Sequence, residues 1–79
     1  AARAARRQGL VPGVIYGGAG DTISVSLEGR EVNRVLRTPG LMTVDMTVTV
    51  NGDIERVRLH DVQRHPVTEA PLHLDFVRR

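Results

Sequence analysis

Cysteine is absent from this chain of 79 residues, which excludes a disulfide scaffold, a zinc site with cysteine ligands and a thiol nucleophile. Tryptophan is absent as well, and the aromatic side chains are limited to Tyr16 and Phe76. Two aromatic residues are too few for a platform on which nucleic-acid bases stack. No apolar run approaches the roughly 20 residues that a membrane-spanning helix needs. The composition therefore predicts one small domain with a small core and no membrane partner.

Lysine is missing too, so all 11 basic residues are arginines, set against nine acidic residues. The arginines are unevenly placed, because the first nine residues contain Arg3, Arg6 and Arg7 and no acid. A guanidinium presents a planar fork of donors that matches phosphate oxygens. A basic arm of this kind can also stay in solvent or contact a membrane surface. We interpret residues 1–9 as a basic arm that becomes ordered on a partner.

Alternation of apolar and polar residues predicts a mainly β domain. We expect strands over residues 14–16, 21–27, 41–50, 54–62 and 72–77. Asn51 and Gly52 form the strongest hairpin signal, because both tolerate the positive φ of a type I′ turn. The apolar spacing within residues 28–37 predicts one short helix. Such a set of strands favours a small antiparallel barrel or sandwich with one exposed face.

Three patterns that resemble chemical sites lack what the chemistry requires. The glycine-rich segment 17–20 is followed by a strand and not by Lys-Ser/Thr and a helix, so it is not a phosphate loop. The histidines have no spacing typical of metal ligands. Ser24 and Ser26 lie in the middle of a predicted strand, away from the sharp turn that a serine nucleophile uses. We therefore expect no enzymatic activity, no metal and no cofactor.

His73 and Asp75 are the most informative polar pair. Their spacing puts both on one face of the last predicted strand, while Leu74 and Phe76 point to the other face. A rigid strand with two such groups side by side suits the reading of base edges or 2′-hydroxyls. The alternative is a surface contact of the two side chains with each other.

Two long motifs of the chain resemble the signatures of one family. The first reads RAARRQGLVPGVIYG from Arg3 to Gly17, and the second reads DVQRHP from Asp61 to Pro66, followed by LHLDFV from Leu72 to Val77. Both are similar to segments of the bacterial large-subunit ribosomal proteins that bind 5S rRNA (the bL25 type), whose longer relatives form the general stress protein Ctc group. The resemblance covers essentially the whole chain.

This resemblance implies a small closed antiparallel β-barrel with one short helix, as a single domain over residues 1–79. The barrel of the family has six strands, and the first of them is missing from this chain. A structural, non-enzymatic role in the large subunit of a cytoplasmic or organellar ribosome is implied as well. The partners would be the loop E region of 5S rRNA and neighbouring ribosomal proteins and rRNA.

Carried over position by position, the resemblance implies RNA contacts at Arg3, Arg6, Arg7, Tyr16, Gln63, His73 and Asp75. Ala4 stands where many members carry a further arginine, so one contact of the family is lost. Arg64 and His65 belong to the second motif, and we expect that they could shape the loop before Pro66.

Two other functions fit a small β domain. A protein–protein adaptor would bind through an apolar patch, yet the predicted outward residues of the hairpin are threonines, arginines and a histidine. A fragment of a synthetase with an anticodon-binding barrel would continue into catalytic domains and has no need of the arm over residues 1–9. Salt-insensitive binding would indicate the adaptor.

Overall fold

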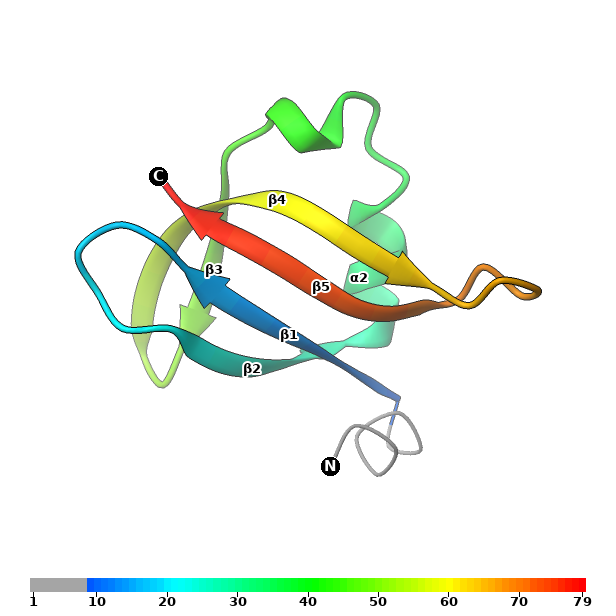
Figure 1. The fold of residues 1–79 in the computed structure, drawn as a ribbon, viewed down its shortest axis with the longest axis horizontal. Helices are drawn as coiled ribbons and strands as arrows, with labels where there is room; N and C mark the ends of the chain where they lie inside the picture. Colours follow the sequence, from blue (N-terminus) through cyan, green and yellow to red (C-terminus); the bar gives the residue numbers. More distant parts are fainter. Residues whose placement is uncertain (1–8) are drawn as a thin grey trace.

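The protein, described over residues 9–79 by a computed structural model, is a curled five-stranded sheet with a short helix behind it (Figure 1). Its elements in chain order are β1 (Leu10–Tyr16), β2 (Ile23–Glu28), α2 (Gly29–Val35), the 3₁₀ helix η1 (Leu41–Thr43), β3 (Met46–Val50), β4 (Asp53–Arg64) and β5 (Pro71–Arg78). The expected mainly β fold with one short α-helix is confirmed.

The strands lie in the order β2-β1-β5-β4-β3. Three of the neighbouring pairs are antiparallel, whereas β1 and β5 run parallel, with Tyr16 opposite Val77. The sequence prediction of a wholly antiparallel sheet is wrong at this pair. Parallel neighbours need a long crossover, and all the chain between β1 and β5 provides it.

The sheet curls so that its edge strand β3 lies behind the central strands, on the same side of the sheet as α2 (Figure 1). Within residues 9–79, β2 and β3 are not paired with each other, and the sheet is therefore half of a barrel. A groove of about 290 Å³ lies between β2, α2 and β3, and Leu59, Leu74 and Phe76 are among the side chains that line it.

The core lies on the inner face of the sheet. Ile15 on β1 and Val57 on β4 are fully buried, and they are joined by Val11, Leu59, Leu74 and Phe76. α2 covers this face with Val32, while Val35 and Leu36 are half-buried against the same cluster. The helix has only seven residues, too few to be stable alone in water, so its packing on the sheet maintains it.

Two local predictions have opposite outcomes. The Asn51-Gly52 turn is confirmed, because both residues have positive φ, 51° and 87°. The strand expected over residues 41–50 is wrong in its first half, where η1 begins after Gly40 and β3 starts only at Met46. Gly40 adopts φ 67° and its carbonyl accepts bonds from the backbone N–H and the hydroxyl of Thr43, which closes a turn.

Candidate nucleic-acid interface

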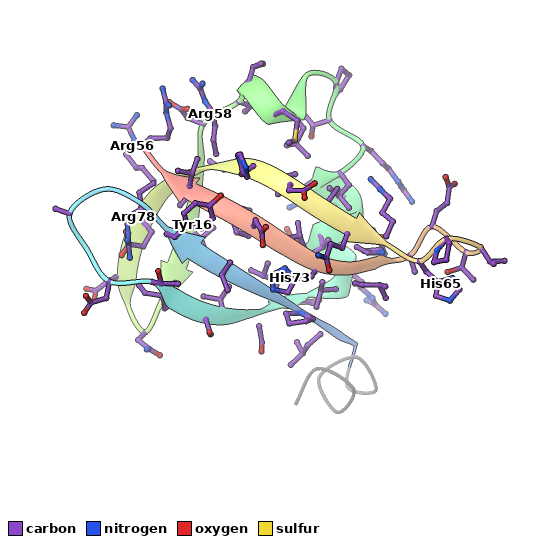
Figure 2. The ribbon with its side chains drawn as sticks, in the orientation of Figure 1. Tyr16, Arg56, Arg58, His65, His73 and Arg78 are labelled. Carbon is purple, nitrogen blue, oxygen red and sulfur yellow. The ribbon has the colours of Figure 1, made fainter. Side chains whose placement is uncertain are left out.

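The outer face of β1, β5 and β4 carries four of the residues expected to bind RNA. Since Leu74 and Phe76 are buried, the alternate residues of β5 point to the opposite side of the sheet. His73 lies opposite Gln63 of β4, and Tyr16 of β1 lies opposite Val77. Figure 2 shows Tyr16 and His73 on the side of the sheet away from α2. The topology therefore brings Tyr16, Gln63, His73 and Asp75 to one face.

His73 and Asp75 contact each other on this face. The His73 Nδ1 lies 3.0 Å from Asp75 Oδ1, and about a third of each side chain stays exposed (31% and 32%). The contact that the alternative interpretation required is thus present. It holds the imidazole and the carboxylate as one unit, which still offers the second ring nitrogen and the second carboxylate oxygen to a ligand.

Asp61 extends this polar surface. It lies opposite Asp75 in the β4–β5 register, next to an irregularity between Leu59 and Asp61. Its Oδ1 accepts a bond from the backbone N–H of Val62 at 2.8 Å. Sequence reasoning missed Asp61 as a surface neighbour because the register shift brings it to the same face as Asp75.

Tyr16 packs edge-on against His60 of β4, with ring centroids 6.1 Å apart and an interplanar angle of 85°. The half-buried phenol ring is thereby fixed above the sheet. The strand β5 lies between β1 and β4, so this contact crosses over β5 and connects the strands on its two sides.

His65 has a structural position in the loop between β4 and β5. Its Nδ1 accepts bonds from the backbone N–H groups of Val67 (3.1 Å) and Thr68 (3.2 Å). The guanidinium of Arg64 donates to the carbonyl of Glu69 at 3.3 Å. These contacts agree with the expectation that Arg64 and His65 shape this loop.

Arg78 holds the loop that joins β1 to β2 (Figure 2). Its guanidinium donates to the carbonyls of Gly17 (2.8 Å), Gly20 (3.1 Å) and Asp21 (2.6 Å), and it also pairs with Glu55 at 3.3 Å. The side chain is only 11% exposed. Gly17 and Gly18 adopt φ 86° and 64°, which favours glycine in this tight approach. Arg78 is therefore a structural residue.

Three other arginines gather around one carboxylate where β5 ends. Arg58 Nε donates to Asp45 Oδ1 at 2.7 Å, Arg79 Nε lies 3.4 Å from the same oxygen, and Arg56 lies 3.9 Å from Oδ2. The bond from Arg58 and the three positive charges outweigh desolvation and lower the pKa of Asp45. We call these four residues the Asp45 cluster. Sequence reasoning missed it, although Arg56 and Arg58 at alternate strand positions were the available signal.

The remaining expected contacts, Arg3, Arg6 and Arg7, lie outside the described residues. Over residues 9–79, no group of three or more His, Asp or Glu side chains is placed to hold a metal ion. In the same part of the chain, none of the helices combines the length and the apolar character that a membrane crossing requires.

Known proteins are similar to this chain over almost its whole length. The model of the Ribosomal L25p family matches residues 1–76. The large ribosomal subunit protein bL25 of Rhodospirillum rubrum is 47% identical over 79 residues, and that of Marinomonas sp. is 44% identical over 78 residues. Each match covers 99% of this chain but only 38% and 41% of the relative.

A shorter relative is matched over most of its length. The bL25 protein of Acinetobacter baumannii is 37% identical over 78 residues, which are 99% of this chain and 80% of the relative. The chain thus spans about two fifths of the first two curated relatives and four fifths of the third. By the family model and by these identities, the chain belongs to the Ribosomal L25p family.

Proposed function

We propose that this chain is a structural component of the large ribosomal subunit of the bacterial cytoplasm and that it binds 5S rRNA at the loop E region. The observation that carries the proposal is the gathering of Gln63, His73 and Asp75 on one exposed face, in a chain whose relatives are large-subunit proteins. Membership of a ribosomal-protein family supports a structural role over an enzymatic one, and it favours this role over an adaptor or a synthetase fragment.

The geometry suits a shallow RNA groove. A-form RNA displays base edges and 2′-hydroxyls in a wide, shallow minor groove, which the convex outer face of the curled sheet can approach. Gln63 and His73 lie opposite each other on neighbouring strands, and Asp75 adds an acceptor two residues further along β5. These groups would set the register of the protein on the RNA by hydrogen bonds.

The arginines would supply most of the affinity. Each guanidinium that meets a phosphate releases condensed counterions, and this contribution does not depend on base sequence. The arm residues Arg3, Arg6 and Arg7 are our candidates for these contacts. With about four to six neutralised phosphates, the logarithm of the binding constant should fall against the logarithm of salt concentration with a slope of roughly −3 to −5.

A gel-shift titration tests the proposal. The protein is titrated against 5S rRNA and against the same RNA with loop E replaced by Watson–Crick pairs. We expect tighter binding to the natural loop, because non-canonical pairs reshape the groove that the outer face reads. Equal affinity for the two RNAs would contradict recognition of loop E, and a salt-insensitive complex would contradict binding through phosphates.

A further inference from the structure

We propose that the Asp45 cluster is a second binding site for RNA phosphates, at the end of the outer face where β5 finishes. This inference rests on the proposed function and extends the RNA footprint beyond the arm and the residues around His73. Its members are Asp45, Arg56, Arg58 and Arg79, drawn from the segment before β3, from β4 and from the end of the chain.

The cluster already accommodates an oxyanion. Two guanidinium groups, those of Arg58 and Arg79, converge on one carboxylate oxygen of Asp45, and Arg56 approaches the other oxygen. Planar guanidinium donors bind carboxylate and phosphate oxygens in the same geometry. The same guanidinium donors can therefore exchange the carboxylate of Asp45 for the oxygens of an RNA phosphate.

The cluster keeps an excess of positive charge. Three arginines surround one carboxylate, and the lowered pKa of Asp45 keeps that carboxylate ionised, so a charge of +2 remains. The side chains of Arg56 and Arg79 are 71% and 44% exposed, and they are free to change partner. Arg78, in contrast, is committed to the loop carbonyls and to Glu55, so it adds nothing to this excess.

The position of the cluster favours RNA as its ligand. Arg58 lies opposite Val77, whose other neighbour is Tyr16, so the cluster continues the outer face (Figure 2). His73 lies six residues before Arg79, about 20 Å along an extended strand. Because β1 and β5 are parallel, β1 begins at the His73 end of this face. The cluster thus lies at the other end of the predicted reading surface from the start of β1.

The test compares two single substitutions that each remove one exposed arginine. Arg56→Ala removes a member of the cluster, and Arg37→Ala removes an arginine in the turn after α2. The dissociation constant for 5S rRNA is measured across a salt series. For Arg56→Ala we expect the salt slope to flatten by about 0.7 to 0.9, so that its deficit against wild type changes roughly threefold over a fourfold change in salt. Arg37→Ala should keep the wild-type slope.

A second pair of variants tests the competition between carboxylate and phosphate. Asp45→Asn removes the oxyanion that the arginines now bind, and Asp53→Asn removes an equal charge at the β3–β4 hairpin. We expect Asp45→Asn to bind 5S rRNA more tightly than Asp53→Asn does. Thermal melting of all four variants shows that each is folded.

The outcomes separate this inference from the proposed function. Equal salt slopes for Arg56→Ala and Arg37→Ala, or equal affinities for the two Asp→Asn variants, would overturn the second phosphate site while loop E discrimination still stands. If Arg56→Ala weakened binding to a purified ribosomal protein and left RNA binding intact, the cluster would be a protein contact and the inference would be wrong. Loss of loop E discrimination by the wild-type chain would instead remove the proposed function.

Discussion

The two faces of the central strands β1, β5 and β4 differ residue by residue. On β5 the inner residues Leu74 and Phe76 are 2% and 5% exposed, whereas the outer residues His73 and Asp75 keep about a third of their side chains exposed. No buried polar side chain occurs on residues 9–79. A strand repeats every two residues, so adjacent positions have opposite surroundings.

Under the proposed function, stability and recognition are carried by alternate residues of the same strands. The inner face contributes apolar burial, which stabilises the fold roughly in proportion to the area removed from water. The outer face contributes polar groups that lose little on unfolding, because water replaces their partners. Neighbouring substitutions on β5 should therefore give opposite phenotypes, and the following predictions test that separation.

Phe76→Ala should give the largest effect. Phe76 is 5% exposed, lies in the core cluster and lines the groove between β2 and β3. Truncation of such a ring lowers the free energy of unfolding by about 3 to 5 kcal/mol, a large part of the stability of so small a domain. Urea denaturation followed by circular dichroism measures this change. A loss below about 1 kcal/mol would show that the core does not depend on Phe76.

Arg78→Leu should give the second largest effect. It sharpens the comparison of the two faces because Arg78 is a charged residue with a structural role. The variant leaves the carbonyls of Gly17, Gly20 and Asp21 without their donor. We expect a loss of about 1.5 to 3 kcal/mol in unfolding free energy, the usual range for hydrogen bonds to a charged group. Hydrogen exchange should speed up at the loop between β1 and β2. An unchanged exchange rate there would contradict the role of Arg78. Arg78→Lys tests whether a positive charge without the planar guanidinium is enough to hold the loop.

His73→Ala should weaken RNA binding and leave the stability almost unchanged, the reverse of the two variants above. We expect RNA binding to weaken by about 1 to 3 kcal/mol, the range for a good base-edge contact. The unfolding free energy should stay within about 0.5 kcal/mol of wild type, because the side chain is exposed and its contact is with Asp75 alone among the described ion pairs. Titration against 5S rRNA measures the affinity, urea denaturation measures the unfolding free energy, and Thr49→Ala on β3 is the control for both. A loss of stability without a loss of affinity would place His73 with the structural residues.

Local periodicity was sufficient to predict most of the strands, the helix and the face on which two of the candidate residues lie. The strand expected over residues 54–62 is present as β4, in which Val57 and Leu59 are buried, and Asn51-Gly52 correctly predicted the hairpin. The shared face of His73 and Asp75 followed from their spacing alone. These features depend on residues that are close in sequence, where backbone geometry determines the outcome.

Features that depend on distant pairing could not be predicted in this way. The parallel pairing of β1 with β5 and the Arg78 contacts with Gly17 and Asp21 join segments about sixty residues apart. The Asp45 cluster requires β4, the residue after β5 and the segment before β3 to meet. The alternation of apolar and polar residues continues through residues 41–43, so the sequence predicted a strand there. Gly40 and Thr43 close a turn instead, and η1 forms.

Asp45 should give the smallest effect, visible only as a dependence on pH. Its pKa is lowered in the folded protein, chiefly by the hydrogen bond from Arg58, so the folded state favours the ionised carboxylate. The resulting stabilisation is complete above the unfolded pKa of about 3.9 and is lost as the pH falls through the lower folded pKa. The melting temperature of wild type should therefore fall more steeply below about pH 4 than that of Asp45→Asn, and the two curves should converge at the most acidic pH. High salt should reduce the difference, since the cluster is exposed. The other carboxylates are the same in wild type and in Asp45→Asn, so they contribute equally to both curves. An offset in melting temperature that stays constant from neutral to acidic pH would mean that the arginines around Asp45 do not bind its charge in solution.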